Sequence, residues 1–99
     1  MTLEETLRIN RLYDLYGRLL TKQQQEIIED YYEANLSLSE ISEIRKISRT
    51  AVSDALKVAI KKLENYEEKI GICGVFDEIR TPKNSEILDK IEEKIKNGI

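Results

Sequence analysis

The sequence predicts a single all-α domain, a helical bundle with a central helix-turn-helix and a further helix at its C-terminal end. Three observations predict this fold class. Apolar residues recur at intervals of three and four positions along most of the chain, which is the period of an amphipathic helix. One Pro and four Gly among 99 residues leave few turns, so a fold of many short strands is disfavoured. A chain of this length supports one core, and we therefore assign residues 1–99 to one domain, with a helical extension from about residue 84.

The first helix is predicted over residues 3–20. Thr2-Leu3-Glu4-Glu5 has the pattern of a capping box, because the Thr hydroxyl can accept from the amide of the last Glu and that side chain can return to the Thr amide. Gly17 is either a mild cost inside this helix or a point of close approach. A second helix follows over residues 22–34, and Asn35, which tolerates the left-handed conformation, ends it.

The middle of the chain has the local signals of a helix-turn-helix. Ser37-Leu38-Ser39-Glu40 is a second capping box, and it opens a short helix that ends near Arg45. After a short break, Ser48 caps a long amphipathic helix that Gly71 ends. Apolar side chains are expected to close the small core where the two helices cross: Ile41, Ile47, Val52 and Leu56. A short helix, a tight break and a capped helix are the parts that a helix-turn-helix requires.

The C-terminal third of the chain is less regular. Val75, Phe76 and Ile79 fit either a short helix or an ordered turn. Thr81-Pro82 marks a boundary, after which Asn84 is expected to cap a last helix. That helix has a narrow apolar stripe, which packs on the body of the protein or on a second copy: Ile87, Leu88, Ile91 and Ile95. We favour a homodimer, because helix-turn-helix proteins often use two copies to read two half-sites.

Charge is unevenly distributed along the chain. The net charge is −3, yet residues 45–62 hold six Lys or Arg and one acid, whereas residues 1–44 carry a net −5 and residues 63–99 a net −3. A local basic band of this kind is what an anion-binding surface needs when the whole chain is acidic. The alternative interpretation is a solvated helix face with ordinary lysines.

The basic band coincides with the second helix of the helix-turn-helix. With Ser48 as its cap, the first two turns expose side chains that can reach base edges or phosphates, and lysines as far as Lys62 extend the positive rim. Arg49 suits a bidentate contact with a guanine or a phosphate, and the positive end of the helix dipole favours a phosphate beside it. We predict these nucleic-acid-binding residues: Lys46, Ser48, Arg49, Thr50, Ser53, Asp54, Lys57 and Lys61.

Composition argues against several other classes of function. Histidine is absent, and no phosphate-cradling Gly loop or metal-ligand cluster is present, so we predict no enzyme activity, no metal and no cofactor. Cys73 is the single cysteine, and we interpret it and the five tyrosines as core or interface residues rather than reactive or base-stacking groups. The acidic, polar N-terminus is not a signal peptide and no run of residues is apolar enough to span a membrane, which favours the cytoplasm.

Several stretches across about residues 1–80 together resemble the YlxM-type helix-turn-helix proteins, small bacterial cytosolic proteins akin to region 4 of sigma factors. The resembling stretches are residues 10–21, Tyr31-Tyr32, residues 37–41, 47–52 and 63–69, with Asp77-Glu78-Ile79 at the end of the family core. The resemblance implies a sigma region 4-like helical fold in which the helix after Ser48 is the recognition helix. It also implies an association with the signal recognition particle pathway.

The turn of the motif departs from the family pattern. Lys46 stands where the family usually has Gly, so either a non-Gly residue adopts a positive φ, at a cost of roughly 1 kcal/mol, or the turn has a different shape. Arg45 occupies a position that is usually apolar, and Ile44 one that is usually polar.

Two functions remain open from the sequence. The first is a DNA-binding regulatory protein that uses the basic band and that the resemblance links to the signal recognition particle pathway. The second is a protein- or RNA-interaction module that binds a component of the signal recognition particle, with the helix-turn-helix serving only as a scaffold.

Overall fold

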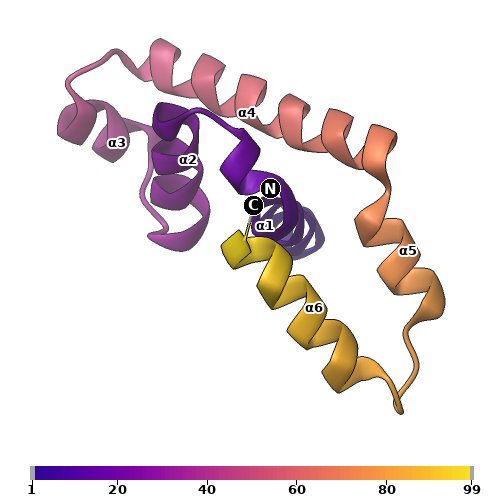
Figure 1. Cartoon of the computed structure of the whole chain (residues 1–99). Helices are drawn as coiled ribbons and strands as arrows, with labels where there is room; N and C mark the ends of the chain where they lie inside the picture. Colours follow the sequence, from indigo (N-terminus) through magenta and orange to yellow (C-terminus); the bar gives the residue numbers. More distant parts are fainter. Residues whose placement is uncertain (1, 99) are drawn as a thin grey trace.

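The computed structural model describes residues 2–98, and every regular element within them is helical (Figure 1). The α-helices are α1 (Leu3–Tyr16), α2 (Lys22–Ile28), α3 (Leu38–Arg45), α4 (Arg49–Ile70), α5 (Ile72–Ile79) and α6 (Ser85–Gly98). A 3-10 turn, η1 (Gly17–Leu19), follows α1, and a π-helical turn, η2 (Glu29–Glu33), follows α2. The predicted all-α bundle is confirmed. Within the described residues, no helix has both the length and the apolar composition needed to cross a bilayer.

Helix α4 is the centre of the hydrophobic core. Its buried stripe consists of Val52, Leu56, Ala59 and Leu63, and α1, α2 and α3 all pack against it. Figure 1 shows α4 as a long rod, with α3 at its N-terminal end and α1, viewed along its axis, beneath its middle. Leu12, Ile27 and Ile41 are fully buried members of the three packed helices. The core side chains predicted for the crossing of α3 and α4 therefore lie in or against this core.

The helix starts largely follow the predicted caps. Ser37 and Glu40 form a complete capping box, with the Ser hydroxyl accepting from the Glu40 amide at 3.1 Å and the Glu40 carboxylate accepting from the Ser37 amide at 3.0 Å. The hydrogen bond from the Ser37 amide to the carboxylate, together with the interaction with the Ser37 side chain, lowers the pKa of Glu40. Thr21 and Gln24 form a second complete box. At Thr2, the hydroxyl accepts from the Glu5 amide at 3.1 Å, but the return bond from the Glu5 side chain is absent within residues 2–98.

The ends of the first two helices differ from the prediction because tertiary packing reshapes them. The α-helical part of α1 stops at Tyr16, and a Cβ on Gly17 would lie 2.7 Å from the Tyr13 ring. Gly17 is therefore a point of close approach. The second helix changes to π-helical form at Glu29, and Asn35 ends the segment with φ 56°, as predicted.

The segment 71–83 contains a short helix, α5, which resolves the ambiguity left by the sequence. The helix α6 begins one residue after Asn84, whose carbonyl accepts from the Leu88 amide at 2.9 Å. The side chain of Asn84 does not act as the predicted cap. Its Oδ1 instead accepts from the Thr81 amide at 2.7 Å, and its Nδ2 donates to the Ile79 carbonyl at 2.8 Å. This side chain closes the turn before α6.

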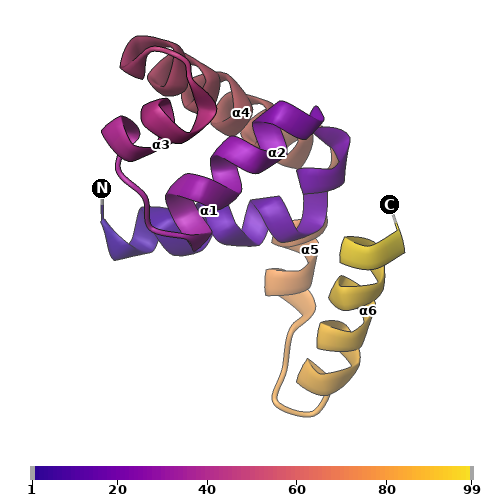
Figure 2. The same ribbon diagram turned by 90° about the vertical axis from the view of Figure 1, so that its left-hand side faces the viewer.

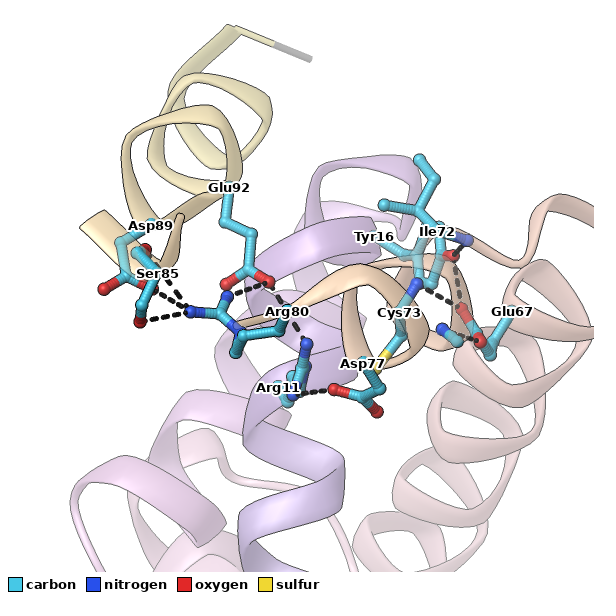
Figure 3. A network of polar contacts seen from close by, with 11 residues as sticks. Arg11, Tyr16, Glu67, Ile72, Cys73, Asp77, Arg80, Ser85, Asp89 and Glu92 are labelled. Carbon is cyan, nitrogen blue, oxygen red and sulfur yellow. Dashed lines mark hydrogen bonds and ion pairs between the residues drawn. The ribbon is translucent and has the colours of Figure 1, made fainter. Parts of the chain in front are cut away.

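A buried polar corner joins α1, α4 and α5 (Figure 3). The Tyr16 hydroxyl donates to Glu67 Oε1 at 2.6 Å and accepts from the Ile72 amide at 3.1 Å. The amides of Cys73 and Gly74 donate to the two oxygens of Glu67, each at 3.0 Å. Glu67 therefore caps the start of α5. The residue at the N-cap position is Gly71, which has no side chain that could accept these hydrogen bonds.

Titration of this corner reflects its hydrogen bonds. Burial opposes ionisation of Glu67, but the hydrogen bonds from Tyr16 and from the two amides outweigh it and lower the pKa of Glu67. Burial, together with the bond to Glu67, raises the pKa of Tyr16 to about 12. Burial also raises the pKa of the neighbouring Cys73 thiol, which agrees with the apolar role predicted for this residue.

Helices α5 and α6 project together from α1, as Figure 2 shows. Ion pairs hold them there: Arg11 contacts Asp77 at 2.6 Å and Glu92 at 3.1 Å, and Arg80 contacts Glu92 at 3.2 Å and Asp89 at 2.9 Å (Figure 3). Glu92 thus links the two arginines. The apolar contribution of α6 to the core is small, and it comes from buried Leu88 and half-buried Ile95.

Candidate nucleic-acid interface

The turn between α3 and α4 is tight and left-handed. Lys46 has φ 58° and ψ 41°, so a non-Gly residue adopts the conformation that usually selects Gly. The Lys46 amide donates to the Ser42 carbonyl, and the Ile47 amide donates to the same oxygen at 3.2 Å. The first of the two alternatives for this turn is therefore correct, with its cost of roughly 1 kcal/mol. The side chain of Lys46 is left in solvent.

The side chain of Arg45 holds the turn through ion pairs with Glu26 and Asp30. Its guanidinium contacts Asp30 through Nε at 2.9 Å and through NH2 at 2.8 Å, and it contacts Glu26 through NH1 at 2.9 Å. The bond to Asp30 is the main reason that the pKa of Arg45 is raised. The two acids lie one helical turn apart on the α2–η2 segment, so α3 is tied to that segment at the point where the chain turns into α4. The sequence offered only one signal of this role, an arginine at a position that is usually apolar in the family.

Ser48 starts the second helix of the motif as predicted. Its hydroxyl accepts from the Ala51 amide at 3.0 Å, and its backbone is extended, with φ −69° and ψ 155°. Because this cap fixes the first turn, the direction of every later side chain of α4 follows from the helical repeat.

Two stripes run along α4 on opposite sides. The buried stripe is Val52, Leu56, Ala59 and Leu63. The same spacing shifted back by two residues gives Thr50, Asp54, Lys57 and Lys61, all of which are exposed. A shift of two residues is a rotation of about 200° around a helix, so this second set faces directly away from the core. We call it the outer stripe.

Four of the predicted site residues form this outer stripe, and the other four lie in the turn before α4 and in its first two turns: Lys46, Ser48, Arg49 and Ser53. Of the eight, all are exposed except Ser53, which is half-buried. The four cations among them are Lys46, Arg49, Lys57 and Lys61, and none makes an ion pair within residues 2–98. These cations are therefore exposed at the left-handed turn, in the first turn of α4 and on the outer stripe, with their charges available.

Lys62 does not belong to this surface, contrary to the prediction that it extends the positive rim. It is half-buried, and its Nζ donates to Gln24 Oε1 on α2 at 3.4 Å. Its position on the helical repeat explains the difference, because Lys62 follows Lys61 by about 100° and so turns back toward the bundle.

No group of three or more metal-ligating side chains gathers within the part of the chain that the structure describes. Two acidic residues from pairs of adjacent glutamates have structural partners: Glu67 caps α5, and Glu92 joins Arg11 and Arg80. The outer stripe therefore presents one hydroxyl, one carboxylate and two ammonium groups on a capped helix.

Comparisons with known proteins agree with the motif. The model of the family described as "Putative helix-turn-helix protein, YlxM / p13 like" matches residues 3–98. A UPF0122 protein of Clostridium kluyveri is 38% identical over 111 residues, covering 98% of this chain and 100% of the relative. One from Caldanaerobacter subterraneus subsp. tengcongensis is 49% identical over 96 residues, covering 97% of this chain and 74% of the relative. The resemblance seen in the sequence is confirmed, and the chain belongs to the UPF0122 family of YlxM/p13-like helix-turn-helix proteins.

Proposed function

We propose that this protein is a DNA-binding regulator that inserts the N-terminal half of α4 into the major groove of duplex DNA. The observation that carries the proposal is a set of four exposed cations without ion pairs in residues 2–98: Lys57 and Lys61 on the outer stripe opposite the buried stripe of α4, Arg49 in the first turn of α4, and Lys46 in the turn before it. A recognition helix has to be held by the core on one side and to be free on the other. The family's helix-turn-helix description supports the same function.

The shape of α4 favours DNA over duplex RNA. The major groove of B-form DNA is about 12 Å wide and admits an α-helix, whereas the corresponding groove of A-form RNA is deep and narrow. Rigidity adds to this preference. Ser48 caps the helix and Arg45 holds the turn against Glu26 and Asp30, so little order has to be gained on binding.

Salt dependence gives the first quantitative expectation. If the four free cations all contact phosphates, the slope of log K against log salt is about −3.6, so affinity falls about 100-fold between 50 and 200 mM salt. The surrounding segments are acidic and repel the duplex, which confines its approach to this one surface.

The direct test is a double variant, Arg49→Ala with Lys57→Ala. We expect it to bind duplex DNA at least 10-fold more weakly and to reduce the salt slope by about 2, while thermal unfolding stays unchanged because both side chains are exposed. The matched control is Lys83→Ala with Lys94→Ala, which removes the same charge from exposed positions distant from α4 in sequence. Equal binding by the wild type and the Arg49/Lys57 variant would refute the proposal.

A second candidate function is an interaction module for a component of the signal recognition particle pathway, which the family resemblance implies. The observation that favours it is Ile44, which is 59% exposed on the outer face of α3. The two candidates separate in a pull-down of the tagged protein. Capture of a signal recognition particle component that survives nuclease and high salt, and is lost in Ile44→Ser, would support the second candidate over the first.

We also propose the domain organisation, the location and the oligomeric state of the protein. Residues 1–99 act as one domain without catalytic activity, in the cytoplasm, where a single buried thiol needs no disulfide partner. Two copies bind together, so that two α4 helices reach two half-sites. The surface we assign to this homodimer is the exposed part of the α6 stripe, where Ile87 is 60% and Ile91 43% exposed.

A further inference from the structure

The outer stripe of α4 contains one carboxylate, that of Asp54. It is the only acid among residues 45–62, and it lies in the middle of the stripe, one turn after Thr50 and one turn before Lys57. Its side chain is exposed. Within residues 2–98 it makes no ion pair, even though Lys57 follows at the favourable spacing of three residues.

An acid in this position opposes the electrostatics of the proposed function. A carboxylate that faces the duplex is repelled by phosphates, so it weakens binding to DNA of any sequence. The fold does not require it either, since Asp54 caps no helix and contacts no cation in the described chain. A role for Asp54 therefore has to come from a ligand group that a carboxylate can bind.

A carboxylate only accepts hydrogen bonds. In the major groove, the donors are the N4 amino group of cytosine and the N6 amino group of adenine. Beside its N6 group, adenine presents N7, an acceptor that repels a carboxylate. Cytosine has no such acceptor next to its N4 group on the groove edge, so it is the base that suits Asp54.

The position of Asp54 on the helix also suits a base rather than a backbone contact. A recognition helix that docks by its N-terminus brings its first two turns nearest the base edges, and Asp54 is in the second turn after Ser48. Its side chain is short and points straight out from the core. The longer side chains of Lys57, one turn further along the stripe, and of Arg49, in the first turn of α4, have the reach to contact phosphates.

We propose that Asp54 is a specificity-determining residue, which accepts a hydrogen bond from the N4 amino group of a cytosine in the major groove and so fixes one G·C pair in the target site. This inference rests on the proposed function. It adds a sequence preference to a surface that is otherwise described only by its positive charge.

The test is selection of binding sites from a randomised DNA duplex by the full chain, comparing the wild type with Asp54→Ala and Asp54→Asn. The wild type is expected to prefer cytosine at one position by roughly 5- to 150-fold, the range for one good base contact. Asp54→Ala should lose that preference and bind bulk DNA more tightly, because a repulsive charge is gone. Asp54→Asn should change the preference at the same position from cytosine to adenine, since Asn pairs with adenine N6 and N7.

Two controls make the outcome decisive. Lys57→Ala should weaken all sequences alike and keep the cytosine preference, and thermal unfolding should be equal for every variant. If both Asp54 variants bind all duplexes more tightly with an unchanged preferred sequence, Asp54 only lowers affinity and the inference is overturned, although the protein still binds DNA. If the wild type retains no duplex at low salt, the proposed function itself fails, and this inference fails with it.

Discussion

The substitution Tyr16→Phe, which removes only the hydroxyl oxygen, tests how strongly the polar corner joins α5 to α1 and α4. The Tyr16 side chain is 1% exposed, and its hydroxyl both donates to Glu67 at 2.6 Å and accepts from the Ile72 amide at 3.1 Å. In Tyr16→Phe the ring still fills its place in the core. The change therefore isolates the polar contacts from the packing.

The expected decrease in the free energy of unfolding follows from the hydrogen bonds that Tyr16→Phe removes. A hydrogen bond to a charged group contributes about 1.5–3 kcal/mol, and an amide left without a partner adds to the loss. Glu67 is half-buried and keeps its two bonds from the α5 amides, so we expect about 2–3 kcal/mol in the free energy of unfolding. For a chain of this size that is a fall in Tm of about 10–20 °C.

Urea and thermal unfolding measure this change, and Tyr66→Phe is the matched control. Tyr66 donates to the Leu19 carbonyl across 3.4 Å at an exposed position, so its variant should lose less than about 0.5 kcal/mol. If Tyr16→Phe were as stable as Tyr66→Phe, the polar corner would not hold α5 and our reasoning would be wrong.

The same corner predicts how stability depends on pH. The pKa of Glu67 is lower in the folded protein than its ordinary value of 4.5. The stability that this carboxylate contributes is therefore complete above pH 4.5 and is lost as the pH falls through the lowered folded value. The difference between the wild type and Tyr16→Phe should accordingly be largest near neutral pH and should shrink in acid.

Two further predictions concern the turn and the proposed homodimer. Lys46→Gly should raise the free energy of unfolding by about 0.5–1 kcal/mol, because it relieves a positive φ. It should also weaken DNA binding, because it removes a free cation. A variant that gains stability and binds as well as the wild type would exclude Lys46 from the interface. The double variant Ile87→Ser with Ile91→Ser should leave Tm within a few degrees, since both side chains are largely exposed. In sedimentation experiments it should behave as a monomer where the wild type is a dimer. A wild type that sediments as a monomer at all concentrations would refute the dimer.

The parts of the fold that the sequence predicted are those set by local signals. Ser37 and Ser48 mark the two helix starts through hydrogen bonds spanning three residues, and the helical repeat then fixes which side of α4 is buried. The direction of Lys57 and Lys61 follows from the same repeat, which explains why the outer stripe was predictable. Its binding to DNA remains a prediction.

The parts that the sequence missed depend on contacts between distant residues. The hydrogen bond that links Glu67 to α1 comes from Tyr16, which lies 51 positions away. Arg45 gains its partners only when α3 folds against the segment that holds Glu26 and Asp30. Neither spacing nor propensity encodes such contacts.

The arginines of the chain show how binding and folding are separated in this molecule. Arg11, Arg45 and Arg80 each contact two acids and hold helices together, whereas Arg49 has no acidic partner in residues 2–98 and stands in solvent at the first turn of α4. An exposed cation without a partner contributes little to stability. Substituting Arg49 should therefore change binding and leave folding unchanged, while substituting Arg45 should disturb both, because Arg45 ties the end of α3 to Glu26 and Asp30 next to the turn into α4.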